Sequence, residues 1–276
     1  MNVKIAAIIM KKEMRDARRN RWFVVVSFLF ALLSVSFSLF GMAGLGSLGV
    51  AGFGRTAASL LNLVLLIVPL LGLLLGSVSI VSEREQGTLM TLLAQPVTPN
   101  EIFLGKYLGS AFSIFSTVFL GFGVSAIAIA KYAGTKEIAD YLMLVCFTVL
   151  LGLAFLSIAF CVSLLVRRHA TAMGTAIFIW FFFIFISDLG LMGTSIVLKL
   201  TPMALFWLVV LNPAQAFKVA VVGNLQKSFE IFGAAGLYAT ETLGRWLSPI
   251  LIVTLCLWIF LPLVLAFFYF RSRCVD

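Results

Sequence analysis

Few side chains in this sequence are of a type that could do chemistry, and they lie far apart. The single histidine, His169, follows two arginines. Asp188 is the one acidic residue inside a long apolar run, where a carboxylate either serves a transport pathway or meets water at the end of the run. The cysteines form no CxxC pair, and we expect them to be small buried side chains: Cys146, Cys161, Cys256 and Cys274. Neither a GxxxxGK phosphate-binding loop nor an HExxH metal motif occurs, so the sequence predicts no ATP site, no metal site and no catalytic centre of its own.

The most informative segment is polar and runs from residue 82 to residue 109, SEREQGTLMTLLAQPVTPNEIFLGKYLG. An apolar run stops there, and three charges follow at once: Glu83, Arg84 and Glu85. A short apolar run begins after Gly87 and Thr88, with leucines at helical spacing: Leu89, Leu92 and Leu93. These leucines could pack against the chain's own helices or dock into a groove on a cytoplasmic partner. The adjoining charges and the proline that ends the short run favour docking, because a plain connector between two helices needs neither.

A new helix is expected at the end of this segment. Pro96 ends the short apolar run. Thr98, Pro99 and Glu101 then form a capping box, with Thr98 as the N-cap, Pro99 at the first helical position and Glu101 at the third. The sequence therefore predicts a short helix held between two longer ones, in a cytoplasmic loop over residues 83–100.

The elements that position this loop are predicted to lie in a membrane. Of the 276 residues, 62% are hydrophobic and 11% are charged, whereas a soluble domain has about 45–50% apolar and about 25% charged residues. We expect an all-α membrane protein with one permease domain over residues 1–276. Its six spans are predicted at about 22–44, 60–82, 107–130, 141–166, 171–190 and 248–270.

The distribution of basic residues predicts the orientation of these spans. If the N-terminus is cytoplasmic, 13 of the 20 Lys and Arg residues fall in inner segments, and both termini are inside. This asymmetry accounts for most of the net charge of +9, so no nucleic-acid partner is needed to explain it.

Residues 1–21 are predicted to form an amphipathic basic helix in contact with membrane lipid. Apolar residues recur there at steps of three and four, beside a face rich in Lys and Arg: Val3, Ala7, Met10, Met14 and Ala17. A plain topology signal is the alternative interpretation. Both interpretations place this segment on the cytoplasmic side.

The stretch from 190 to 247 is predicted to be an outer region with short helices that rest on the membrane or dip into it. Thr201 and Pro202 begin a run of about ten apolar residues, which Asn212 and Pro213 interrupt. That run is too short to span a bilayer. A seventh span would move Arg271 and its neighbours outside, which the charge distribution disfavours.

The loop and the spans together resemble the permeases of ABC-2 type ABC transporters. The residues that match the motif of that family after its second helix are Glu83, Gly87, Thr88, Pro96, Val97, Thr98, Ile102, Gly105 and Lys106. The resemblance implies a homodimer in the bacterial inner membrane, with separate cytoplasmic ATPase subunits that bind ATP and Mg²⁺. It also implies that residues 83–95 act as a coupling helix and that this chain binds no cofactor.

A second string, LNPAQAFK from Leu211 to Lys218, is similar to an element of one branch of that family, which serves maturation of the copper enzyme nitrous oxide reductase. That branch implies a β-helical periplasmic partner held by the outer region, with Asn212, Pro213, Gln215 and Lys218 as contact residues. No cluster of Met, Cys or His lies in the spans to ligate copper. The sequence therefore leaves three possibilities for the cargo: copper, a sulfur species, or no cargo at all. An exporter of lipid, drug or polysaccharide and a non-transporting scaffold are the alternatives.

Overall fold

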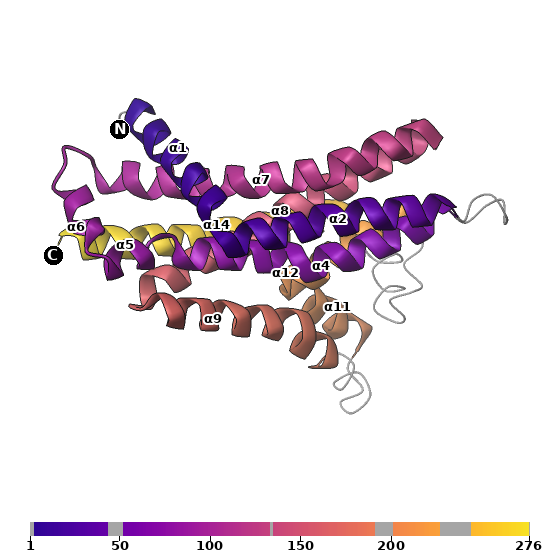
Figure 1. Ribbon diagram of the computed structural model, residues 1–276. Helices are drawn as coiled ribbons and strands as arrows, with labels where there is room; N and C mark the ends of the chain where they lie inside the picture. Colours follow the sequence, from indigo (N-terminus) through magenta and orange to yellow (C-terminus); the bar gives the residue numbers. More distant parts are fainter. Residues whose placement is uncertain (1–2, 44–51, 133–134, 191–200, 227–243, 276) are drawn as a thin grey trace.

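The computed structural model describes an all-helical chain, and all the regular structure within the described ranges is helix (Figure 1). Those ranges are residues 3–43, 52–132, 135–190, 201–226 and 244–275. Six helices are long and apolar enough to span a membrane: α2 (Arg21–Ala43), α4 (Gly52–Ser79), α7 (Pro99–Tyr132), α8 (Thr135–Leu165), α9 (His169–Phe181) with the π-helix η1 (Phe182–Ile186), and α14 (Leu247–Val275). They confirm the six predicted spans.

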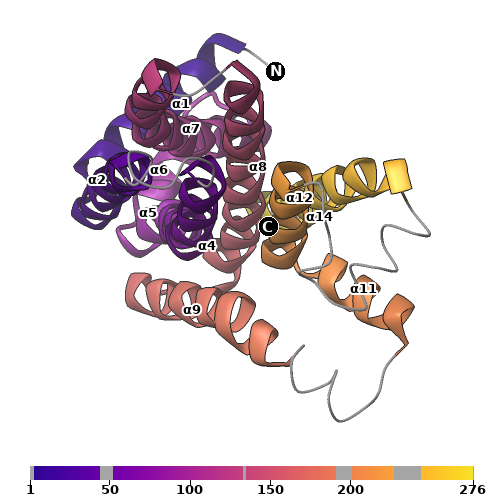
Figure 2. The ribbon, with the colours of Figure 1, turned by 90° about the vertical axis from the view of Figure 1, so that its right-hand side faces the viewer.

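Helix α4 is the most buried of these spans and packs most extensively against α8 (Figure 2). Two glycines make this close approach possible. A Cβ atom on Gly72 would lie 2.8 Å from the carbonyl oxygen of Gly152, and one on Gly76 would lie 2.7 Å from the Cβ of Ala159. Small residues give helices in lipid the van der Waals contact that a hydrophobic driving force gives in water. Gly72 and Gly76 thus serve a helix–helix contact within the chain.

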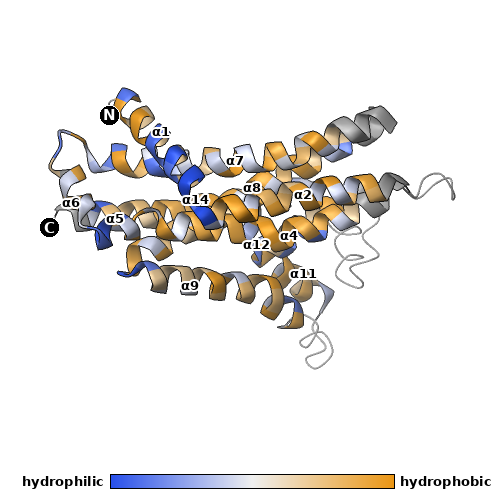
Figure 3. Ribbon diagram, in the orientation of Figure 1, coloured by the Kyte–Doolittle hydropathy of each residue, from blue (hydrophilic) through white to orange (hydrophobic). Residues whose placement is uncertain are grey.

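The N-terminal helix α1 (Val3–Arg19) lies across α7 (Figure 1). Its buried residues are Ile9, Glu13 and Ala17. Hydrophilic residues, blue in Figure 3, gather toward the end of the helix that joins α2, where Arg18 and Arg19 form the last turn. The predicted apolar stripe is only partly buried: Ala17 on it is buried, whereas Val3 and Ala7 are exposed. The helix itself agrees with the prediction, and its place at the membrane interface stays a prediction.

The described part of the outer region contains two short helices at a sharp angle. Helix α11 (Pro202–Leu211) and helix α12 (Pro213–Gln226) meet at a bend of 110°. Thr201 caps α11 by accepting a hydrogen bond from the amide of Ala204, as its position before a proline predicts. Helix α12 is largely buried against α14, α8 and α4 (Figure 2). The prediction of short helices in this region agrees with the structure, and whether they rest on the membrane or dip into it stays a prediction.

The beginning of α1, the end of α14 and the loop between α4 and α7 all lie at one end of the molecule (Figure 1). An even number of crossings has this result. The predicted cytoplasmic loop and the two chain ends thus share one side of any membrane that the spans cross.

Candidate functional site

Two short helices build the loop after the second span: α5 (Val81–Glu85) and α6 (Thr88–Leu93). Gly87 joins them with a φ of 73°, in the left-handed region that favours glycine. The hydroxyl of Thr88 donates a hydrogen bond to the carbonyl oxygen of Glu83, at 3.3 Å. The loop is therefore an ordered pair of helical turns.

The capping box that ends the loop has the predicted geometry. The Thr98 amide donates to Oε2 of Glu101 at 3.0 Å, and the Glu101 amide donates to the Thr98 hydroxyl at 3.4 Å. Pro99 is the first residue of α7, and Pro96 lies between α6 and α7. The chain therefore leaves α6 and enters α7 through a fixed turn.

The apolar side chains of α6 point in two directions. Leu89 and Leu92 are half-buried and pack against the core of the chain. Met90 is 76% exposed. The side chain of Leu93 lies outside the described residues. Of the two alternatives for the leucines, the structure contains the contact with the chain's own helices, and Met90 is the apolar group of α6 that is free to meet a partner.

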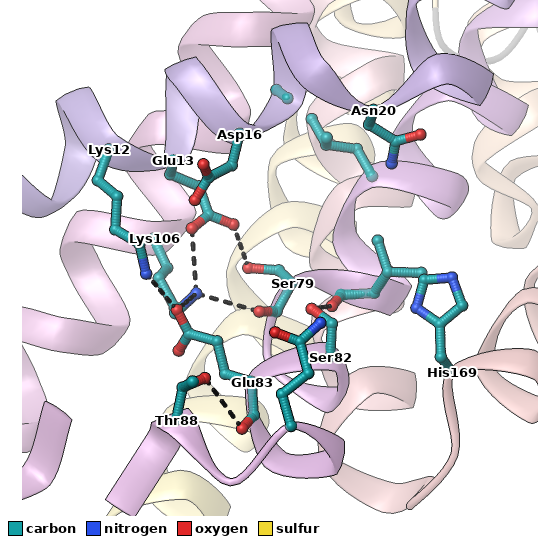
Figure 4. A pocket seen from close by; sticks show the side chains of 14 residues that line it. Lys12, Glu13, Asp16, Asn20, Ser79, Ser82, Glu83, Thr88, Lys106 and His169 are labelled. Carbon is teal, nitrogen blue, oxygen red and sulfur yellow. Dashed lines mark hydrogen bonds and ion pairs between the residues drawn. The ribbon is translucent and has the colours of Figure 1, made fainter. Parts of the chain in front are cut away.

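A buried lysine connects the loop to two other helices (Figure 4). The Nζ atom of Lys106, on α7, lies 3.0 Å from Oε2 of Glu13 on α1 and 3.0 Å from Oε1 of Glu83 on α5. It also donates to the carbonyl oxygen of Ser79, at 3.0 Å. The Lys106 side chain is only 2% exposed, so these three oxygens replace the water that it lost.

Two further contacts complete this charge cluster, which consists of Lys12, Glu13, Ser79, Glu83 and Lys106. Lys12 Nζ lies 2.6 Å from Oε1 of Glu83, and the Ser79 hydroxyl donates to Oε1 of Glu13 at 2.6 Å. Removing one partner of a buried ion pair costs about 3–5 kcal/mol, because the other charge stays behind without water. The cluster therefore fixes α1, α4, α5 and α7 relative to one another.

The other two charges of the loop tie it to the opposite side of the bundle. Arg84 donates to the carbonyl oxygens of Leu164 at 3.0 Å and Val166 at 3.3 Å, at the end of α8. Oε2 of Glu85 accepts from the backbone amide of His169 at 2.7 Å, where α9 begins. All three predicted charges thus bind groups of the chain itself, and they hold the loop against α7, α8 and α9.

Glu13 and Lys12 were missed as site residues because their partners are distant in the sequence. Glu13 is separated from Lys106 by 93 positions. One local signal was present: Glu13 lies four residues after Ile9 and four before Ala17, so an acidic residue stands on the buried face of α1.

A second polar cluster lies at the far end of α9, made by Ser187, Asp188, Asn212, Gln215 and Lys218. Asn212 Nδ2 donates to the carbonyl oxygen of Phe183 at 3.0 Å and to the Ser187 hydroxyl at 2.5 Å. Gln215 Nε2 donates to Oδ1 of Asp188, and Lys218 Nζ lies 3.8 Å from Oδ2 of the same residue. Asp188 is therefore paired within the chain.

The predicted role of this region as a partner surface needs correction. Asn212, Pro213 and Gln215 are buried, and the side-chain amides of Asn212 and Gln215 bind the chain itself. They hold α11 and α12 against α9, so they cannot touch an outer protein in this conformation. Lys218 is partly exposed and stays a candidate contact.

Within the described ranges, no group of three or more His, Cys, Asp or Glu side chains could hold a metal ion. The three cysteines with described side chains, Cys146, Cys161 and Cys256, are free thiols, and Cys274 lies outside the described side chains. What the arrangement can do is mechanical: it can pass a displacement of the loop to the helices that hold it.

Comparison with known proteins decides the family. A profile described as ABC-2 family transporter protein matches residues 7–273. The chain belongs to the ABC-2 family of transporter permeases. Over 273 residues it is 35% identical to proteins named "Probable ABC transporter permease protein NosY" from Stutzerimonas stutzeri and from Pseudomonas aeruginosa. The alignment covers 96% of this permease and 97% of each relative.

Membership of this family gives the braced loop its context. An ABC transporter needs an ATPase, and the sequence of this permease has no phosphate-binding loop. The ABC-2 permease is thus the membrane subunit of a transporter. The end of the molecule that carries α5 and α6 is also the end where its two chain termini lie (Figure 1).

Proposed function

We propose that this permease converts ATP hydrolysis by separate cytoplasmic ATPase subunits into movement of its transmembrane helices, with α5 and α6 as the coupling element. Two copies form the membrane part, and two ATPase subunits, which bind ATP and Mg²⁺, dock beneath them. Both termini and the loop face the cytoplasm at the bacterial inner membrane. The predominance of Lys and Arg in the inner segments supports this orientation.

The observation that carries the proposal is the bracing of the loop. Glu83 connects it to α1 and α7 through Lys106, and Arg84 connects it to the end of α8. Glu85 connects it to the start of α9. A push on α5 and α6 therefore reaches four helices through charged contacts, without relying on flexible chain.

We further propose that the transporter serves copper-site assembly of nitrous oxide reductase. The 35% identity to proteins named NosY and the LNPAQAFK string support this role. A β-helical periplasmic protein is the expected outer partner. Because Asn212, Pro213 and Gln215 are buried, that partner would meet Lys218 and other exposed residues of the outer side.

The exposed methionine of α6 gives a direct test of coupling. Met90→Asp places a charge on the one described apolar side chain of α6 that points away from the core, so docking of an ATPase subunit is expected to weaken at least tenfold. Co-purification of the ATPase with the tagged permease measures this. Membrane insertion is expected to be unchanged.

Met203→Asp is the matched control, because Met203 is also an exposed methionine but lies on α11. It should leave the ATPase bound. Normal ATPase recovery with Met90→Asp would remove the docking role of α6.

Deletion of the gene tests the copper role. The expected result is nitrous oxide reductase that is made in normal amount but lacks copper, measured by metal analysis of the purified enzyme. Fully loaded enzyme in the deletion strain would instead favour an exporter of lipid, drug or polysaccharide. ATPase activity of the complex that does not depend on this subunit would favour a scaffold.

A further inference from the structure

The span that begins with α9 contains one irregular turn. The π-helix η1 (Phe182–Ile186) follows α9 directly, and the helix continues through Ser187 and Asp188. The amide of Ser187 donates to the carbonyl oxygen of Phe182, five residues back, whereas a regular α-helix pairs it with Phe183, four residues back. A π-turn of this kind accommodates one extra residue in an α-helix and is frequent at functional sites. The mechanism proposed above has no role for η1.

The carbonyl group that loses its α-helical partner at this turn is bound from another element. Asn212, at the sharp bend between α11 and α12, donates from Nδ2 to the carbonyl oxygen of Phe183 at 3.0 Å and to the Ser187 hydroxyl at 2.5 Å. Its Oδ1 atom accepts from the amide of Ala214 at 2.8 Å, which fixes the direction of the side-chain amide. Asn212 is buried, and a carbonyl group in apolar surroundings is costly without a donor. Asn212 therefore stabilises the π-turn relative to a regular α-helix.

Two residues of α12 hold the same span just beyond the turn. Gln215 Nε2 donates to Oδ1 of Asp188, and Lys218 Nζ lies 3.8 Å from Oδ2 of the same carboxylate. If η1 becomes α-helical, every residue after the turn moves by one helical position, which is a rotation of about 100° and a shift of about 3.8 Å. Ser187 then takes the place of Asp188 opposite α12. The contacts of Asn212 and of Asp188 therefore depend on one register of the helix, and a change of register breaks them together.

The part of the span before η1 is bound to different helices. Trp180 Nε1 donates to the carbonyl oxygen of Leu66, in α4, at 2.9 Å. The amide of His169, where α9 begins, donates to Oε2 of Glu85 in α5. The only buried residues of α9 are two alanines, so little side-chain packing resists its movement. Helix α9 is thus held by α4 and α5, whereas the chain after η1 is held by α12, and any movement of α9 relative to α12 has to be taken up at η1.

We propose that η1 is a register switch and that Asn212 is the positioning residue that sets it. In one register η1 is a π-turn, which Asn212, Gln215 and Lys218 hold against α11 and α12. In the other register η1 is α-helical, and the end of the span has turned so that Asp188 leaves α12. This inference rests on the proposed function, because it takes α5 to move α9 during ATP hydrolysis. Its consequence is that the movement reaches α11 and α12 as a change in their contacts with the span.

Distances between spin labels test the switch in the complete complex of permease and ATPase subunits, reconstituted in lipid nanodiscs. In a permease without native cysteines, the labels are attached through Leu189→Cys, after η1, and Met203→Cys, on α11, which are both exposed positions. One distance is expected without nucleotide. Trapping with ATP and vanadate should add a second distance, shifted by up to about 3.8 Å, because residue 189 moves by one helical position.

Asn212→Leu removes the donor and should produce the shifted distance without nucleotide. Asn224→Leu, on α12, is the matched control and should keep the wild-type distance, because Asn224 Nδ2 donates to the Ala220 carbonyl of its own helix. Deletion of Ile186, an exposed residue of η1, removes the extra residue, so that η1 becomes α-helical while Asp188 keeps its place. The deletion should give one distance with or without nucleotide, and adding Asn212→Leu to it should no longer shift that distance. A purely structural role of Asn212 would not disappear in this background.

A second pair of labels separates the switch from the proposed coupling. Leu165→Cys and Ile177→Cys lie before η1, at the end of α8 and within α9, and they report whether ATP moves α9. A change at this pair with an unchanged distance between residues 189 and 203 overturns the switch alone. No change at either pair overturns the coupling and the switch together. An unshifted distance with Asn212→Leu also overturns the switch.

Discussion

Lys106 brings a positive charge to a position where water cannot reach it, and two carboxylates compensate that charge. Such an arrangement is a poor source of net stability, because the desolvation of the ions offsets most of their attraction. Its strength is geometric. The ion pairs are favourable only over a narrow range of distances, so they restrict how α1, α5 and α7 can be arranged around Lys106.

Lys106→Met is expected to destabilise the protein by about 3–5 kcal/mol, because Glu13 and Glu83 then face each other in a buried site with one cation fewer. Thermal unfolding of the detergent-solubilised protein measures this. Adding Glu13→Gln to Lys106→Met should recover part of the loss, since it removes one of the stranded charges. An unchanged unfolding temperature for Lys106→Met would contradict the role of the charge cluster.

At the scale of elements, two glycines of α7 decide where α1 lies. A Cβ atom on Gly109 would lie 2.6 Å from the Cβ of Glu13, and one on Gly105 would lie 2.8 Å from the Cβ of Ile9. The approach of the two helices leaves no room for a side chain there. The cluster around Lys106 depends on this close contact, because a displaced α1 would withdraw Glu13.

Gly109→Leu is expected to push α1 away from α7, so that α1 unfolds locally more often and its basic residues, which are already exposed, become better cleavage sites. Trypsin should then cleave within α1 roughly tenfold faster than in the wild type, measured by mass spectrometry of the products. Gly123→Leu is the matched control: it changes the same helix at a glycine with nothing within 4 Å of the added atom. Equal cleavage rates for both variants would show that the close contact does not hold α1.

Local signals in the sequence predicted the elements well. The apolar runs predicted the spans, and the capping box at Thr98 and Glu101 agrees with the hydrogen bonds seen. The buried face of α1 was not predicted, because the tertiary contact with Gly105 and Gly109 determines which side of the helix packs against the chain. The π-helix η1 has no signature in its run of phenylalanines.

The site was predicted only where its contacts are local. Glu83, Arg84 and Glu85 stood out as charges at the end of a span, but their partners come from α1, α7, α8 and α9. Charges at the end of a span look the same in sequence whether they face a partner or the chain's own helices. Asn212 and Gln215, predicted as contacts of an outer partner, are buried within the chain, and their burial could not be predicted for the same reason.

At the scale of the whole molecule, the loop and the two termini lie at the same end. Residues at that end should therefore be accessible from the same side of the membrane. In a variant without native cysteines, Met90→Cys should react with a membrane-impermeant maleimide only after spheroplasts are opened. Arg271→Cys, near the C-terminus at the end of α14, should behave in the same way. Labelling of either residue in intact spheroplasts would contradict the orientation.

The charge cluster also sets an order of events during synthesis. Glu13 leaves the ribosome 93 residues ahead of Lys106, which at about 5–20 residues per second is a delay of about 5–20 s. During that interval α1 lacks its contact with α7, while α2 and α4 are expected to be entering the membrane already. Docking of the N-terminal helix is therefore a late step in biogenesis, and a nascent chain shorter than about a hundred residues carries it as an untethered, positively charged arm.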